Sequence, residues 1–389
     1  MLIGEAVLRS NPRYELVVLD RLEPGEREQI TGEADGRHAP YGLLRPTPDS
    51  ALEPRVVSTD TALLFLTLAV PGPCPEYVRT GLGANLAAAL GRLVLDGILE
   101  VEIEGEFRSG AAGWAPLNPV GRESRHGGRT TKLSEEAIRY GQALVSLAPL
   151  PAELVAARLY MYGRRPVTPA LRRQVSSQWI LGGASKALRQ AWIETPATSP
   201  DTPWRSWQPR RSGVRGRRLS VSFKLYISPT TETLPAAVSA VATVLAEAPG
   251  VTGFKVGRTV DGVTRPDKMV AYFSSLEELH EGARRIRDEA GACRPHGVPF
   301  TAGVTDDGLL SWAIDPPGGS TDPARRSSWR TWVAMRLAEY LLDARAGEPS
   351  GNGEAGEAWQ VALARLALDG VDTATWVPDP RLFDYAAAG

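Results

Sequence analysis

The chain has 389 residues, of which 43% are hydrophobic and 23% are charged, and its formal net charge at pH 7 is −1. This length predicts two or three globular domains, and the balanced charge argues against general nucleic-acid binding. Glu5 and Arg9 come too early for a signal peptide, and no run of about 18 apolar residues predicts a membrane span. Cys74 and Cys293 have no disulfide or zinc spacing, so we expect a cytoplasmic protein. From its charge and its hydropathy we expect it to bind neither nucleic acid nor membrane.

Residues 1–125 are predicted to form a small α+β domain of winged-helix type. A segment with helical spacing over 82–95 is followed by an alternating segment over 98–110 that turns back on itself. A winged helix binds DNA or adds a peptide strand to the edge of its hairpin, the wing. DNA is disfavoured because the helix has only Arg92 as a cation and the wing is acidic. The acidic residues of the wing are Glu100, Glu102, Glu104 and Glu106. Binding of a leader peptide and a purely structural role both stay open.

A Gly- and Arg-rich stretch over 110–132 predicts a linker. Residues 126–194 are then predicted to be a helical segment, with helices over 134–147 and 152–161. This segment also carries a short tract of aromatic and basic residues, Tyr160, Tyr162, Arg164 and Arg165. These side chains could extend a phosphate-binding surface, although aromatic residues at helical spacing more often pack into a core.

Residues 195–219 hold four prolines and six arginines and are predicted to be a Pro/Arg-rich linker. The arginines are Arg205, Arg210, Arg211, Arg215, Arg217 and Arg218. Together with Trp204 and Trp207, such a run could tether RNA. Because the rest of the chain lacks a basic excess, we favour a flexible loop near the path of an anionic substrate.

Residues 220–345 carry the clearest strand patterns. Three segments, 221–228, 253–256 and 269–273, alternate in the manner of strands buried on one side. Because alternate residues share a face, one surface can carry Lys224, Tyr226, Lys255, Lys268 and Tyr272. Lysines and phenols without a set of cysteine or histidine ligands indicate phosphate recognition with proton transfer. The alternative is a solvated basic face of a sheet.

The other predicted elements complete this domain. They are a helix over 235–247, a helix that begins after Ser275 with Glu278 completing a capping box, strands within 297–304 and 308–315, and a helix over 329–343. Residues 346–389 are predicted to be a linker and a C-terminal helix over 358–369 that can fold back on the domain.

The stretches "FKLYIS" (223–228), "GFKVGR" (253–258) and "RPDKMVAYF" (265–273) resemble the HopA-type effector family. Members of that family also occur as lyase partners in class V lanthipeptide and thioamitide biosynthesis. The family is distantly similar to phosphothreonine lyases of type III secretion and to the lyase domain of class III lanthipeptide synthetases. The resemblance covers roughly 133–345 and is strongest from about 220 to 305.

The resemblance implies a C-terminal α+β domain like that of the phosphothreonine lyases, which needs neither a cofactor nor a metal. It implies a phosphorylated precursor peptide as substrate and dehydroalanine or dehydrobutyrine as product, in the biosynthesis of a ribosomally made (RiPP) antibiotic. The chain contains no P-loop and no kinase catalytic motif, so a separate Ser/Thr kinase of the same pathway is implied. The alternative is an effector-like module that binds a phosphopeptide or leader peptide without turnover.

The resemblance also implies roles for individual residues. Lys255 matches the base, Lys224 the cation near the carbonyl and phosphate, and Arg265 and Tyr272 the phosphate ligands. Tyr226 stands where the secretion lyases have a catalytic histidine, and a phenol with a pKa near 10 donates its proton less readily than an imidazolium. Further phosphate contacts are expected from Lys268 and Arg258, with Arg330 and Arg336 as more distant candidates.

Two questions about acid–base groups follow from these roles. A base that works near neutrality requires the pKa of Lys255 to be lowered by burial or by cationic neighbours. None of the four histidines, His38, His126, His280 and His296, has the spacing of a ligand set. His296 is an alternative acid, and a place in a surface turn is its other interpretation.

Overall fold

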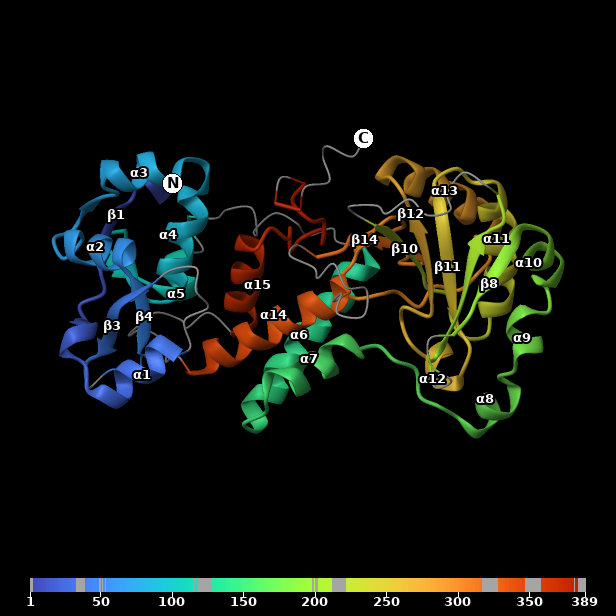
Figure 1. Cartoon of the computed structure of the whole chain (residues 1–389), viewed down its shortest axis with the longest axis horizontal. Helices are drawn as coiled ribbons and strands as arrows, with labels where there is room; N and C mark the ends of the chain where they lie inside the picture. Colours follow the sequence, from blue (N-terminus) through green and yellow to red (C-terminus); the bar gives the residue numbers. More distant parts are fainter. Residues whose placement is uncertain are drawn as a thin grey trace. The chain divides into compact units, whose positions relative to one another are not determined.

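The computed structural model describes residues 3–32, 39–48, 50, 52, 54–114, 116–117, 128–197, 199, 202–211, 222–316, 328–346, 358–380 and 382–383. The predictions for His38, His126, Arg215, Arg217, Arg218 and the linker over 347–357 lie outside these residues. The chain is a mixed α+β protein, as expected, and divides into two compact units (Figure 1). No helix of the described part is both long and apolar enough to cross a membrane.

The first unit comprises Met1–Ser124, Val145–Pro149 and Glu339–Asp369. Its elements are β1 (Val7–Ser10), β2 (Tyr14–Val18), α1 (Pro24–Gly32), β3 (Pro40–Pro46), β4 (Arg55–Ser58), α2 (Thr59–Thr67), β5 (Gly72–Pro73), α3 (Glu76–Leu82), α4 (Leu86–Leu95), β6 (Leu99–Ile103), β7 (Glu106–Arg108), α5 (Gly110–Trp114) and α15 (Ala358–Leu368). One sheet has the order β5-β1-β6-β7 and the other β2-β3-β4. Their core includes Leu90 and Val94 of α4 and Leu99 and Val101 of β6, all fully buried.

The helix predicted over 82–95 is α4, which begins at Leu86 after a 3-10 turn over Gly83–Asn85, and the hairpin that follows is confirmed as β6 and β7. The two-residue turn uses Glu104 and Gly105 at φ 53° and 83°, the left-handed values of a type I′ hairpin turn. Glu100 is not part of an exposed acidic wing, because it is buried and its Oε2 lies 2.6 Å from Nε of Arg9.

The linker predicted over 110–132 is wrong at both ends. Residues 110–114 form α5, which packs so closely that a Cβ on Gly91 of α4 would meet the Trp114 ring at 2.5 Å. The other end of this stretch belongs to a helix that begins at Arg129. The C-terminal helix α15 packs against α4 and α5 of the first unit, with Arg365 Nη2 2.5 Å from an Asp96 oxygen. The expectation that this helix folds back on the strand-rich domain is not supported, since its residues belong to the first unit.

The second unit comprises Arg125–Leu144, Leu150–Ala338 and Gly370–Gly389. Its elements are α7 (Ala152–Tyr160), α8 (Pro169–Gln174), α9 (Ser177–Leu181), α10 (Ser185–Ala191), β8 (Trp192–Thr195), β9 (Trp204–Pro209), β10 (Phe223–Ile227), α11 (Leu234–Glu247), β11 (Val251–Gly257), α12 (Val260–Val263), β12 (Met269–Phe273), α13 (Leu276–Ala290), β13 (Ala302–Gly303) and β14 (Leu310–Ala313). Helices α6 (Arg129–Leu147) and α14 (Trp329–Ala346) contribute residues to both units.

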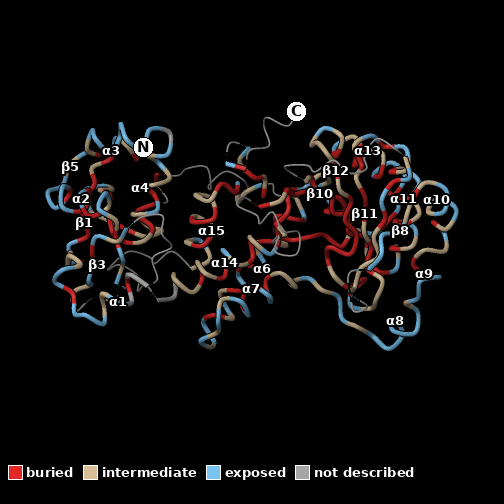
Figure 2. The backbone as a smooth tube through the Cα atoms, in the orientation of Figure 1, coloured by how far each residue is buried: buried red, intermediate tan, exposed pale blue. Residues whose placement is uncertain are grey.

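One antiparallel sheet organises the second unit, with the order β13-β14-β10-β12-β11-β9-β8. Helices α11 and α13 pack against each other beside it (Figure 1), and α13 begins with the predicted capping box, in which Ser275 Oγ accepts from the Glu278 N–H at 3.2 Å. Figure 2 shows buried residues along β10, β11 and β12, where Phe223, Leu225 and Phe254 supply the core.

Two segments of this sheet differ from the prediction. The Pro/Arg-rich linker is wrong for 204–209, which form β9 and pair with β11 along the register Phe254↔Trp207. The strand predicted in 297–304 is reduced to Ala302–Gly303, because Phe300 has φ 63°, which ends any extended run. The hydrogen bonds that hold this buried loop include those from Phe300 N–H to Ser134, from Trp329 Nε1 to the Phe300 carbonyl, and from Arg330 Nε to the Pro299 carbonyl.

Candidate active site

Polar side chains of β10, β11 and β12 project from one face of the seven-stranded sheet. The directly opposite pairs are Lys224 with Tyr272, Tyr226 with Val270, and Lys255 with Val270. Opposite residues in an antiparallel ladder point to the same side, so the two lysines and two tyrosines share this face. The intervening residues, such as Leu225 and Phe254, point to the side of α11 and α13, because period-two alternation sends successive side chains to opposite faces.

Lys255 is half-buried and is surrounded by aromatic rings. Its Nζ lies 4.4 Å from the centroid of the Trp204 ring and 5.8 Å from that of Tyr272. Within the described ranges the amine forms no ion pair with a carboxylate and donates no hydrogen bond. Burial lowers its pKa from the ordinary lysine value, Asp267 opposes this and Arg265 adds to it. The side chain is thus placed to exchange a proton.

Asp267 is the centre of a buried network beside Lys255. Arg265 donates from Nε to Oδ1 at 2.9 Å and from Nη2 to Oδ2 at 3.0 Å, while the Tyr160 hydroxyl donates to Oδ2 at 2.9 Å. Nη1 of the fully buried Arg330 lies 3.1 Å from the same Oδ2. Burial alone would raise the pKa of Asp267, but Arg330, Arg265 and Tyr160 hold it well below the usual range. Asp267 is therefore a permanent anion that orients two arginines.

Arg265 has one edge of its guanidinium committed to this network. Nε and Nη2 face Asp267, and Nη2 also donates to the Tyr160 hydroxyl at 2.6 Å. In the described part of the chain, no partner occupies Nη1. The guanidinium edge of Arg265 that was expected to bind phosphate thus binds the Asp267 carboxylate, which leaves Nη1 as the donor for a substrate anion.

The two tyrosines of the face differ from Lys224 in their partners. Tyr226 is buried, and its hydroxyl has no hydrogen bond among the described residues; burial raises its pKa well above that of an ordinary phenol. Burial also raises the pKa of Tyr272 to about 12, so both phenols are protonated at neutral pH. Lys224 instead forms an ion pair with Asp315, and this pair is largely shielded from solvent.

Lys268 does not join this surface. It is fully buried, and its Nζ lies 2.8 Å from the Pro229 carbonyl and 2.7 Å from Nδ1 of His296. His296 Nε2 in turn donates to the Gly163 carbonyl at 2.6 Å. Burial and the neighbouring Lys268 lower the pKa of His296, so it is neutral at pH 7. A phosphate contact for Lys268 is incompatible with this position, and His296, with both ring nitrogens engaged, is not placed as an acid.

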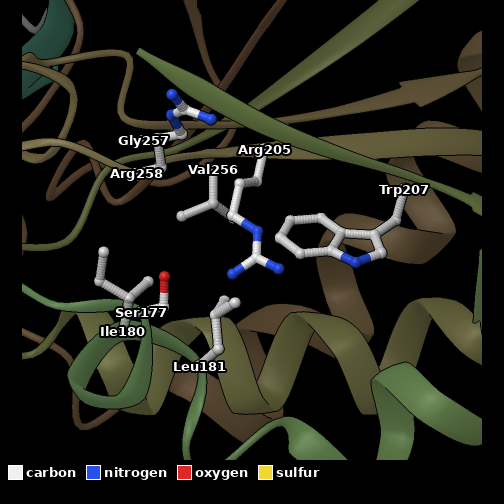
Figure 3. Close-up of a pocket in the computed structure, with 8 residues that line it drawn as sticks. All are labelled: Ser177, Ile180, Leu181, Arg205, Trp207, Val256, Gly257 and Arg258. Carbon is white, nitrogen blue, oxygen red and sulfur yellow. The ribbon is translucent and has the colours of Figure 1, made fainter. Parts of the chain in front are cut away.

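Arg258 also lies away from Lys255. It follows Val256 and Gly257 in β11 and borders the depression drawn in Figure 3, where Arg205 and Trp207 line the helix-covered side of the sheet. Figure 3 shows its guanidinium directed away from that of Arg205. This position gives no support to the phosphate contact expected of Arg258. Arg336 is exposed on α14, whereas Arg330 joins the Asp267 network.

Sequence reasoning missed several residues of the site. Trp204 lies within a predicted linker, and the pattern of lysines and phenols that predicts the site gives no role to the carboxylates Asp267 and Asp315. Asp267 could have been found, since it stands in the same "RPDK" run as Arg265. The described residues contain no cluster of three His, Cys, Asp or Glu side chains placed to hold a metal ion.

No protein-family profile matches the sequence, and none of the curated proteins matches it. Among solved structures, an effector protein from Pseudomonas syringae pv. tomato is similar with a TM-score of 0.42 and 14% identity, over 64% of this chain and 98% of that protein. One from Pseudomonas syringae pv. syringae has a TM-score of 0.41 and 16% identity, over 65% and 99%. The type III effector and phosphothreonine lyase OspF from Shigella flexneri has a TM-score of 0.28 and 12% identity, over 53% and 96%. The chain is thus distantly similar to effector proteins and to phosphothreonine lyases.

Proposed function

We propose that this protein is a carbon–oxygen lyase that eliminates phosphate from phosphoserine or phosphothreonine in a peptide. The observation that carries the proposal is the state of Lys255, a half-buried amine with a lowered pKa and no anionic partner among the described residues. A lowered pKa makes the neutral, proton-accepting form of an amine more accessible, whereas an ion pair with a carboxylate stabilises the charged form.

In the proposed reaction, neutral Lys255 removes the α-proton of the phosphorylated residue. The electrons of that bond form the Cα=Cβ double bond, and the Cβ–O bond breaks with its electron pair leaving on the phosphate oxygen. The Tyr226 hydroxyl donates its proton to this oxygen; its raised pKa keeps the phenol protonated and also makes it a weak acid, so the proton transfer depends on charge that develops on the departing oxygen. The products are dehydroalanine or dehydrobutyrine and hydrogen phosphate, and a proton passes from Lys255 back to Tyr226 before the next cycle.

The charge of the site suits a phosphate dianion. With Lys255 neutral, three cationic side chains, Lys224, Arg265 and Arg330, share the face and its floor with the carboxylates Asp267 and Asp315, so a surplus of one positive charge remains. Arg265 Nη1 and the Tyr272 hydroxyl are the proposed phosphate donors. Lys224 is proposed to leave Asp315 and bind the substrate. There its charge would polarise the carbonyl of the phosphorylated residue and so make the α-proton more acidic.

The proposed setting is lanthipeptide-type biosynthesis in the cytoplasm. A separate Ser/Thr kinase would phosphorylate a precursor peptide, and this protein would convert the phosphorylated residues to dehydroamino acids. This part of the proposal rests on the resemblance of "FKLYIS", "GFKVGR" and "RPDKMVAYF" to the lyase partners of such pathways.

Incubation with a synthetic phosphopeptide tests the activity by mass spectrometry. Elimination gives a peptide lighter by one water than the hydrolysis product, and the released phosphate keeps the original side-chain oxygen. Lys255→Ala is the matched control for contaminating phosphatases. If the parent protein binds the phosphopeptide and never converts it, the alternative of a phosphopeptide-binding module replaces the lyase.

A second function, binding of the precursor's leader at the first unit, is favoured by the place of β7 at the end of its sheet, where no further strand of the described residues pairs with it. Since Ile103 and Glu106 flank the two-residue turn as a hydrogen-bonded pair, the next residue, Phe107, directs its N–H toward the sheet edge. Phe107→Pro should weaken binding of a full precursor but not of a leaderless phosphopeptide, and Phe107→Ala controls for loss of the ring. Equal affinity of the proline and alanine variants for the precursor would rule the edge out.

A further inference from the structure

Trp204 is the first residue of β9 and is held rigidly. It lies opposite Gly257 in the ladder with β11, and the preceding Pro203 carbonyl accepts from the Arg258 N–H at 2.8 Å. The neighbouring backbone is also close, since a Cβ on Gly262 would meet the Pro203 carbonyl oxygen at 2.6 Å. A side chain anchored in this way keeps its place on the sheet face.

Two cations meet the ring of Trp204. Lys255 Nζ is 4.4 Å from the ring centroid and Arg265 Cζ is 5.0 Å from it. The faces of an indole attract cations through the ring quadrupole, and Trp is the strongest of the aromatic side chains in this respect. The ring also covers the Lys255 amine with an apolar surface. A carboxylate in its place would hold the ammonium but would prevent it from acting as a base.

We infer that Trp204 is a positioning residue for Lys255, holding the amine beside Arg265 and covering it from water without supplying an anion. The inference rests on the proposed function for its effect on turnover. The state of the amine itself can be measured without any turnover.

The ring has two opposing effects on the proton affinity of Lys255. Its cover disfavours the charged amine, and its quadrupole favours it. Burial is the larger influence on this lysine, so removal of the ring should raise the pKa of Lys255 toward the ordinary value. The other titratable groups around the amine stay in place in this experiment: Arg265 and Asp267 of the loop before β12, Tyr272 of β12, and Tyr226 and Lys224 of β10.

The first test measures the reactivity of the Lys255 amine with acetic anhydride as a function of pH, by peptide mass spectrometry. We expect Trp204→Ala to label about tenfold more slowly than the parent at pH 7 and to recover at higher pH. The matched control is Trp207→Phe, on the same strand but on the helix-covered face, where Trp207 stacks on Phe254 at 5.0 Å. Labelling curves that coincide for Trp204→Ala and the parent would overturn the inference.

The second test follows elimination from a phosphopeptide. Trp204→Ala should lower kcat at pH 7 by about 10- to 100-fold with KM changed less than about threefold, and the loss should shrink as pH rises; Trp204→Phe should recover most of kcat. A loss that is equal at all pH values, or that lies wholly in KM, would contradict a positioning role. If the parent protein eliminates no phosphate while the labelling difference is observed, the proposed function fails and the inference about Trp204 stands.

Discussion

Lys255 and Lys268 form an instructive pair, because burial lowers the pKa of both and only one is available for chemistry. Lys268 is enclosed on every side and donates to the Pro229 carbonyl and to His296 Nδ1. In the described part of the chain the Lys255 amine forms no hydrogen bond and no ion pair, and the rings of Trp204 and Tyr272 lie beside it. A lowered pKa therefore does not by itself identify a catalytic lysine; the absence of fixed partners separates the two.

The tyrosines repeat this contrast. The Tyr160 hydroxyl donates to Asp267 and accepts from Arg265, which commits it to the network. Tyr226 is a buried residue whose hydroxyl has no hydrogen bond among the described residues, but that oxygen is not one of the fully buried atoms without a partner. The hydroxyl is therefore uncommitted, whereas that of Tyr160 is fixed by two partners.

The largest effect on turnover should come from removing Lys255, compared with removing Lys268. We expect Lys255→Ala to eliminate phosphate at less than about one ten-thousandth of the parent rate while still binding phosphopeptide, because the base has no substitute. Lys268→Ala should keep turnover within about tenfold in the fraction that folds. Rates come from dehydropeptide formation and binding from fluorescence anisotropy. Comparable rates for the two variants would remove the contrast between the lysines.

The next largest effect should come from Tyr226→Phe, which deletes the uncommitted hydroxyl. Turnover should fall by about 10²–10⁴-fold, the usual contribution of a positioned acid, with little change in phosphopeptide binding. Tyr160→Phe is the matched variant and should act through the position of Arg265, raising KM more than it lowers kcat. A Tyr226→Phe enzyme with the parent's kcat would require another acid.

A smaller effect is expected from Arg265→Lys, which keeps the charge and loses the planar fork. Because Nε and Nη2 hold Asp267, the lysine variant cannot hold the carboxylate and the substrate phosphate at once. KM for the phosphopeptide should rise about tenfold, with kcat changed less. Unchanged kinetics would assign Arg265 to the network alone.

The smallest effect concerns stability and pH. Burial lowers the pKa of Lys268 to about 7, whereas an unfolded lysine titrates near about 10.4. Between these values the unfolded chain binds the proton and the folded chain does not, so the free energy of unfolding should rise with pH across this window. Lys268→Met should flatten that rise and cost about 1–3 kcal/mol by leaving buried acceptors unpaired. Thermal melts at pH 7 and pH 9 measure both; an equal slope in the variant would contradict the assignment.

The sequence predicted the central strands well because their apolar alternation is strong. The segments around Lys224, Lys255 and Tyr272 became β10, β11 and β12, and the helix after Ser275 began where the capping box predicted. These features depend on neighbours within a few residues, which a local pattern can report.

Other features depend on distant partners. Residues 204–209 look like a linker by composition and become a strand only because β11 pairs with them. Likewise, nothing in "RPDK" indicates that Arg265 turns its fork to Asp267 instead of toward solvent, since that choice requires Tyr160 and Arg330 from two other helices. Strand alternation predicted that Lys268 lies on the surface with Lys255, but alternation does not report burial, and burial removes Lys268 from that surface.

The left-handed backbone of Phe300 has a consequence for how the protein folds. This conformation is unfavourable for an aromatic residue and is held by hydrogen bonds to Ser134, 166 residues away along the chain, and to Trp329, 29 residues away. The loop cannot be stable until the segments that carry Ser134 and Trp329 are in place. We therefore expect it to become ordered late in folding, when contacts between distant parts of the chain form slowly. Because Arg330 donates to the adjacent Pro299 carbonyl, the floor of the site should be among the last parts of the second unit to form during synthesis of the chain.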